Sequence, residues 1–188
     1  MIPFLKNRSY RRFHQDVEIS VDNLKTMVEA ARFSPSSRNV QPIKFYINNN
    51  REINSKIFPN LGWAGYLTEW SGPIEGERPS AYIFQLHDKN ISAGFSCDNG
   101  IFAQSILLQA VDLGFGGCMI ATFKKEPLSL LLNLPENLEI IMVIALGKPK
   151  EVVIVDDIKD GDVKYWRDQE QNHHVPKRTL DELLYFPE

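Results

Sequence analysis

This sequence of 188 residues has few cysteines, no long apolar run and no large excess of charge of either sign. Its two cysteines, Cys97 and Cys118, are too few for a disulfide framework and favour a reducing compartment. The longest apolar runs, such as residues 140–146, are too short to span a bilayer. The basic residues near the N-terminus precede no apolar segment of the kind found in secretory signals. We therefore expect a cytoplasmic protein without a membrane partner.

The charge balance disfavours a nucleic-acid partner. Lysine and arginine together number 21 against 24 for aspartate and glutamate, a net charge of -3. A chain without a basic excess creates no field that attracts a phosphate backbone. Hydrophobic residues make up 43% and aromatic residues 11%, the balance of an ordinary folded domain. We expect a single domain over residues 1–188.

Several motifs of nucleotide, metal and nucleophile chemistry are also missing. No GxGxxG follows a predicted strand, and neither GxxxxGK[ST] nor HExxH occurs. His173 and His174 are adjacent, so their side chains would point apart, and we expect no metal site. Neither cysteine has a histidine close in sequence that would activate it as a nucleophile. If the chain is an enzyme, a bound cofactor carries the chemistry.

Hydrophobic periodicity predicts helices and strands in an irregular order. The predicted helices are 20–32, 50–58, 97–113 and 126–132, and the predicted strands are 43–47, 81–86, 116–120 and 139–146. Because the order lacks the regular alternation typical of a parallel sheet, it favours an α+β fold with helices flanking a mixed, mostly antiparallel sheet. The helix over 97–113 is apolar on more than one face, which predicts a place at the centre of the domain or at a subunit interface.

Two segments have no regular pattern. Residues 59–80 combine several glycines and prolines with Trp63, Tyr66 and Trp70. A long irregular loop within a domain is usually functional, so we expect a lid whose aromatic rings either contact a ligand or fill the core of the lid itself. Residues 150–188 are polar and end in a short apolar pattern, which suggests an arm that docks on another surface.

A basic cluster near the N-terminus is the first candidate binding site. Arg8, Ser9, Arg11 and Arg12 lie within five residues. Guanidinium groups suit the geometry of a phosphate, and the hydroxyl adds a donor. The alternative is a basic surface stretch paired with nearby acidic residues.

The segment 34–42 is the second candidate, because amide and hydroxyl groups gather there between a helix and a strand. These groups belong to Ser36, Ser37, Asn39 and Gln41. Such groups can bind a planar heterocycle with carbonyls and ring nitrogens, although a capped turn would also use them. A third feature, the pair Lys177 and Arg178 in the arm, is on its own more typical of a solvated surface.

In their order along the chain these motifs resemble the FMN-dependent nitroreductase family. RSYRRF resembles the family's RxSxRxF, and ARFSPSSRNVQP resembles a helix end of the form AxxxPSxxNxQPW. CDNGIFAQSILLQAVDLGFGGCMIATF is similar to the family's long dimer-forming helix and the GLGxxxI strand that follows it. LLNLPENLEIIMVIALGKPKE and HHVPKRTLDELLYF resemble its LPE-to-LGYPxE segment and its basic-then-apolar arm. The resemblance extends from residue 6 to residue 186, and on it the chain is identified as a member of that family.

The resemblance implies a fold and an activity. The fold would be a three-layer α+β sandwich, dimeric with a C-terminal arm, and with FMN at each end of the subunit interface. The activity would be that of an FMN-dependent oxidoreductase that takes hydride from NADH or NADPH and reduces a nitroaromatic, a quinone or a similar acceptor by a ping-pong mechanism. The alternatives are a specialised member, such as a reductive dehalogenase-like enzyme, and a flavin-binding regulatory protein without turnover. In each case the flavin carries the chemistry, and no side chain is expected to be catalytic.

The resemblance also assigns residues to the cofactor. The flavin phosphate and pyrimidine ring would be bound by Arg8, Ser9 and Arg11 or Arg12, with Lys177 and Arg178 neutralising the phosphate. The partner subunit would contribute Ser36, Ser37 and Asn39, with Gln41 in the same stretch. A backbone N–H near Ala121 and Thr122 would face flavin N5. The sequence departs from many relatives at Ile43, where they carry an aromatic residue, and at Ala121, where several carry glutamate.

Overall fold

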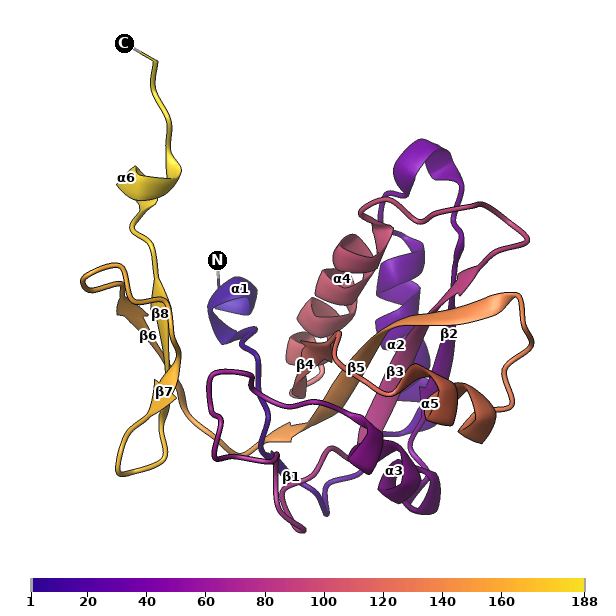
Figure 1. The fold of residues 1–188 in the computed structure, drawn as a ribbon, viewed down its shortest axis with the longest axis horizontal. Coiled ribbons are helices and arrows are strands. Elements are labelled where there is room, and N and C mark those ends of the chain that lie inside the picture. Colours follow the sequence, from indigo (N-terminus) through magenta and orange to yellow (C-terminus); the bar gives the residue numbers. More distant parts are fainter. Residues whose placement is uncertain (1, 188) are drawn as a thin grey trace.

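The structure, a computed structural model, describes residues 2–187 and places helices on both sides of a central sheet (Figure 1). The helices are α1 (Ile2–Lys6), α2 (Val21–Arg32), α3 (Arg51–Ile57), α4 (Asp98–Asp112), α5 (Lys125–Leu131) and α6 (Leu180–Leu183), with 3-10 turns η1 (Ser37–Asn39) and η2 (Phe58–Asn60). The strands are β1 (Phe13–His14), β2 (Ile43–Asn48), β3 (Ala81–Asp88), β4 (Gly116–Ile120), β5 (Leu138–Pro149), β6 (Val153–Asp157), β7 (Trp166–Arg167) and β8 (His173–Lys177).

The central sheet is antiparallel throughout and is organised around β5. The strand order is β1-β5-β3-β2, and β4 pairs with β5 as well. All eight residues of β3 are buried, which requires cover on both faces of the sheet. α2 and α4 lie on one face, and α3 and α5 lie on the other (Figure 1). The expected three-layer α+β sandwich is therefore confirmed.

Side chains alternate between the two faces of β3 and so build two cores. Ile83 packs with Leu24 of α2 and Ile106 of α4 in the first core. Tyr82 and Phe84, its neighbours along the strand, belong to the second core with residues of α3 and α5. This alternation is the period of two that a strand imposes. Both cores are apolar, and burial of their side chains supplies the main stabilisation of the fold.

Local capping signals place the helices where the sequence predicts them. The N–H of Asn23 donates to the Ser20 hydroxyl at the start of α2, and the N–H of Ile53 donates to the Asn50 side chain at the start of α3. α4 buries one face against α2 and the sheet, while Ile101 and Leu108 stay partly exposed. The all-round burial predicted for this helix is therefore incomplete within a single chain. None of the helices within residues 2–187 has the length and apolar character needed to cross a membrane.

The arm contains a small sheet of its own, which the sequence patterns did not predict. β6 and β8 pair in parallel, and β7 pairs with β8 in antiparallel fashion. This sheet stands apart from the central sheet, and α6 and the chain end extend beyond it (Figure 1). The apolar tip is exposed, and its large side chains are Leu180, Leu183, Leu184, Tyr185 and Phe186.

An ion-pair node joins the end of the 59–80 loop to the N-terminal segment and to the beginning of the arm. Glu77 accepts from the Arg12 guanidinium at 2.7 Å and from the Lys150 ammonium at 2.9 Å. Its side chain is only 10% exposed. The hydrogen bonds from Arg12, with those from Lys150, lower the pKa of Glu77 to about 2 despite its burial.

We expect the Glu77 node to make folding acid-sensitive. Because its pKa is lower in the folded state, the node stabilises the fold above the ordinary pKa of glutamate, and this stabilisation is lost as the pH falls from about 4.5 to about 2. Urea denaturation at several pH values should show that wild type loses on the order of 2 kcal/mol more than Glu77→Gln over this range, since other carboxyl groups such as Asp88 titrate in both proteins. Glu52→Gln, which alters an exposed pair with Lys56, is the control and should keep the wild-type slope. Parallel slopes for wild type and Glu77→Gln would contradict this role.

Candidate functional site

The N-terminal segment after α1 runs beside β4, and a glycine makes this approach possible. Ser9 forms a parallel bridge with Gly117, and the N–H of Tyr10 donates to the Gly117 carbonyl at 3.0 Å. A Cβ atom on Gly117 would overlap the carbonyl oxygen of Ala145 in β5. Gly117 thus lets β4 pair with β5 while its other edge receives the arginine-rich segment.

A cavity of about 220 Å³, the Arg11 cavity, gathers residues predicted from three separate motifs. Arg11 comes from the N-terminal cluster, Ala121 and Thr122 from the end of β4, and Trp63 from the 59–80 loop. Tyr165 of the arm completes the wall. A guanidinium, exposed backbone at a strand end and aromatic rings are a suitable set for a flat, electron-rich ligand.

The loop is tied to the strand end at this cavity. The N–H of Gly62 donates to the Thr122 carbonyl at 2.7 Å, and Leu61 pairs with Phe123. Trp63 packs against the second core and also against Phe58, with ring centroids 5.5 Å apart. Its indole nitrogen is buried without a partner in the described chain.

The other two aromatic residues predicted for the lid contact the arm. The ring centroids of Tyr66 and Tyr165 are 5.0 Å apart, and the Arg167 guanidinium lies 4.2 Å from the centre of the Trp70 ring. The loop and the arm thus cover the Arg11 cavity together.

Arg11 and Arg12 have different surroundings, which sequence alone did not separate. The Arg12 guanidinium is held by Glu77, whereas the Arg11 guanidinium lies 5.0 Å from the centre of the Tyr165 ring and contacts His173. Arg11 is therefore the arginine available to a ligand in the cavity. Arg8 donates to the carbonyls of the preceding helical turn, at Phe4 and Asn7.

Glu151, which was not among the predicted site residues, holds the backbone of the segment that carries Arg11 and Arg12. Its carboxylate is fully buried and accepts from the backbone N–H groups of Arg11 and Arg12, the latter at 3.2 Å. The Arg167 guanidinium donates to the same carboxylate at 3.0 Å. Burial lowers the pKa of Arg167, while Glu151 opposes the shift. One buried acid thus connects the N-terminal segment with the arm.

The 34–42 segment lies away from the Arg11 cavity. It joins the ends of α2 and β2 that point away from β1 (Figure 1). The Ser36 hydroxyl donates to Asp98 of α4 at 2.6 Å and accepts from the N–H of Gln41, so its hydrogen-bonding capacity is largely used within the chain. The buried carboxylate of Asp98 also accepts from the N–H of Ser37.

Backbone strain marks the same segment. Arg38, Asn39 and Gln41 have φ values of 49°, 58° and 54°, in the left-handed region that non-glycine residues seldom adopt. Strain of this kind concentrates at functional sites. The segment is consequently a candidate for ligand contact, but one chain does not bring it to the Arg11 cavity.

The basic pair of the arm lies at the end of β8. Arg178 pairs with Glu182 at 3.4 Å, and Lys177 is exposed. Among residues 2–187, no hydrogen bond or ion pair joins either of them to Arg8 or Arg11. Their assignment to a phosphate stays a prediction.

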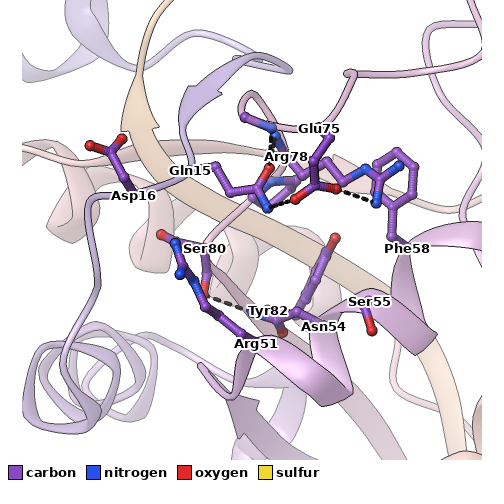
Figure 2. Close-up of a pocket in the computed structure, with 12 residues that line it drawn as sticks. Gln15, Asp16, Arg51, Asn54, Ser55, Phe58, Glu75, Arg78, Ser80 and Tyr82 are labelled. Atoms are coloured by element: carbon purple, nitrogen blue, oxygen red, sulfur yellow. Dashed lines mark hydrogen bonds and ion pairs between the residues drawn. The ribbon is translucent and has the colours of Figure 1, made fainter.

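A second cavity, of about 460 Å³, lies between α3 and the segment that leads into β3 (Figure 2). Many of its polar groups are bonded to one another. Gln15 accepts from the N–H groups of Gly76 and Arg78 and donates to Glu75, and Glu75 pairs with Arg78 at 2.8 Å. Part of the predicted lid, within residues 75–80, lines this cavity, but none of the residues predicted to bind the cofactor does. We therefore take the Arg11 cavity as the candidate site.

Comparison with known proteins identifies relatives of this chain. The model of the nitroreductase family matches residues 5–65 and 78–148, and so leaves out part of the 59–80 loop and the arm. A protein of Archaeoglobus fulgidus assigned as an NADH dehydrogenase or NAD(P)H nitroreductase is 28% identical over an alignment of 147 residues that covers 74% of this chain and 80% of that protein. An NADPH-flavin oxidoreductase of Vibrio harveyi is 25% identical over 78% of this chain and 64% of its own length.

Solved structures share the fold over nearly the whole chain. An FMN-dependent nitroreductase from Clostridium difficile has a TM-score of 0.67 at 22% identity, and covers 100% of this chain and 99% of its own. A nitroreductase family protein from Streptococcus pneumoniae has a TM-score of 0.70 at 15% identity, and covers 99% and 98%. At these identities the likeness concerns the fold.

Proposed function

This chain belongs to the nitroreductase family, and we propose that it is an FMN-dependent oxidoreductase that uses NADH or NADPH to reduce a small-molecule acceptor, such as a nitroaromatic or a quinone. The observation that carries the proposal is the Arg11 cavity, where three motifs far apart in the sequence meet. The relatives assigned as NAD(P)H nitroreductases and as an NADPH-flavin oxidoreductase support the same class of reaction.

The residues of the cavity suit the ring system of a flavin. Arg11 supplies a cation for the side of the ring that gains negative charge on reduction, and the exposed backbone at Ala121 and Thr122 can supply donors. Trp63 and Tyr165 supply apolar walls that exclude water. Arg8, Ser9, Lys177 and Arg178 would bind the phosphate.

Bound FMN would accept a hydride from the nicotinamide and pass it to the second substrate, so this chain needs no titrating side chain for the transfer. Its own residues hold the ring, orient it and keep water away. The family match omits residues 66–77, within the loop that covers the cavity, so the choice of acceptor depends on that loop.

A second copy of the chain would complete the site. The Arg11 cavity is smaller than the roughly 300–1,000 Å³ of ordinary ligand sites. The strained 34–42 segment, with Ser36, Ser37, Asn39 and Gln41, lies elsewhere on the chain and would reach the flavin across a dimer interface. The exposed apolar tip of the arm and the half-exposed face of α4 supply apolar surface for such an interface.

We expect the purified protein to be yellow and to be reduced by a nicotinamide. Its absorption spectrum should show the visible flavin bands, and anaerobic NADPH or NADH should bleach them within seconds. Addition of a quinone or a nitroaromatic should restore the bands, as a ping-pong mechanism requires. Bands that persist with both nicotinamides would favour a flavin-binding regulatory protein. A protein that stays colourless after incubation with FMN would contradict the proposal.

A further inference from the structure

His173 contacts Arg11 of the candidate site, and packing of the fold does not explain why a histidine occupies this position. It lies at the start of β8 and is 1% exposed, and its Nε2 atom is 3.2 Å from the Arg11 guanidinium. A guanidinium only donates hydrogen bonds, so Nε2 must be the accepting nitrogen. The hydrogen of the neutral ring is therefore on Nδ1.

The other ring nitrogen shows that packing alone does not account for this histidine. Within residues 2–187, Nδ1 is buried and has no hydrogen-bond partner. A buried donor without a partner destabilises a fold, so an apolar side chain would serve the packing better. A requirement for the accepting nitrogen at Arg11 explains the residue that is present.

The surroundings of His173 keep its ring neutral. Burial, together with the smaller effects of the positive charges of Arg11, Arg167 and His174, lowers the pKa of His173 to about 4. A neutral ring keeps Nε2 free to accept at neutral pH. His174 differs, because its side chain contacts Asp156 and Asp168 and stacks on Trp166.

Arg11 is thereby fixed from several sides. Its guanidinium donates to the Ser9 carbonyl at 3.2 Å and lies over the Tyr165 ring, while Glu151 holds its backbone N–H. Tyr165 packs against His173, with ring centroids 5.2 Å apart. Glu151, Tyr165 and His173 all belong to the arm, so the docking of the arm determines where the Arg11 charge lies.

We propose that His173 is a positioning residue: by accepting a hydrogen bond from Arg11, it holds the guanidinium at the cavity and so favours the reduced over the oxidised form of the bound flavin. The effect on the flavin rests on the proposed function, whereas the positioning of Arg11 does not. A cation held near the flavin N1 and C2 carbonyl stabilises the negative charge that reduction places there, and a guanidinium free to turn away does so less.

The first experiment needs no flavin. In flavin-free protein, hydrogen exchange at the Arg11 guanidinium is followed by nitrogen-15 NMR in wild type, His173→Phe and His173→Gln. His173→Phe keeps a ring against Tyr165 but removes the acceptor, and should speed exchange about 10-fold. His173→Gln offers an amide oxygen and should restore much of the protection. Arg12, held by Glu77, is the internal reference, and His174→Phe is the matched control.

The second experiment measures FMN affinity in both redox states. In His173→Phe the preference for reduced FMN should fall about 10-fold, equivalent to about 30 mV for a two-electron couple. His174→Phe should keep the wild-type preference, and His173→Gln should lie between. If His173→Phe does not fold, His173→Met, which also lacks a strong acceptor, replaces it.

The two proposals fail in different ways. Equal exchange rates and equal redox preferences in His173→Phe and His174→Phe would overturn the role of His173. Failure of wild-type protein to bind FMN would overturn the proposed function, while the exchange measurement would still decide whether His173 positions Arg11.

Discussion

The double substitution Arg8→Ala, Arg178→Ala is expected to yield protein without flavin. Each guanidinium would form a charge-assisted hydrogen bond with the FMN phosphate, and loss of the two should weaken binding by about 100-fold or more. The measurement is a fluorescence titration of flavin-free protein with FMN. Within residues 2–187 Arg8 bonds only to carbonyls of the preceding turn and Arg178 only to Glu182, so the fold should tolerate both changes.

The control for this experiment removes the same charge elsewhere. Arg51→Ala with Lys56→Ala takes two cations from α3, which is not part of the Arg11 cavity, and should keep wild-type affinity. Riboflavin, which lacks the phosphate, should bind the Arg8/Arg178 variant and the wild type equally. Unchanged FMN affinity in the Arg8/Arg178 variant would refute the phosphate assignment.

The largest expected effect on stability is that of Gly117→Ala. The added Cβ would overlap the Ala145 carbonyl and press on Leu146, both in the central strand β5, so β4 could pair only after the strands separate. We expect a loss of about 3 kcal/mol or more in the free energy of unfolding, measured with urea. FMN binding should also weaken, because the Gly117 carbonyl accepts the hydrogen bond from Tyr10 N–H that holds the arginine-rich segment beside β4.

A second glycine separates the effect of the overlap from that of the residue type. Gly94 lies in the loop before α4, and a Cβ there would meet nothing within 4 Å. Gly94→Ala should therefore change the free energy of unfolding by less than about 0.5 kcal/mol. If the two variants were equally stable, the close approach of β4 to β5 would not be a constraint.

The parts of the fold that the sequence predicts well are those with local signals. The side chains of Ser20 and Asn50 each accept a hydrogen bond from an N–H group three residues further along the chain. Gly114 adopts a φ of +79° at the end of α4. The strands of the arm lack such signals. β6 and β8 are five residues each, are only partly buried and pair in parallel across a long connection, so their pattern does not stand out from a polar segment.

The candidate site was predicted in part for the same reason. The motifs singled out Arg11, Ala121 and Thr122, which the structure brings to one cavity. They could not separate Arg11 from Arg12, because the residue that distinguishes them, Glu77, lies 65 positions away. His173 was set aside because adjacent histidines are poor joint metal ligands. Its contact with Arg11 spans 162 positions and leaves no local pattern.

The central position of β5 has a consequence for the growing chain on the ribosome. β1, β3 and β4 all pair with β5, which ends at Pro149, and before it is made only β2 and β3 can pair with each other. At ordinary rates of translation, synthesis of the residues between the end of β3 and the end of β5 takes on the order of ten seconds. During this time one edge of the apolar strand β3 has no strand to pair with. The last-made strand of the sheet thus sets when folding can finish. Chaperones that bind apolar segments have that interval in which to act.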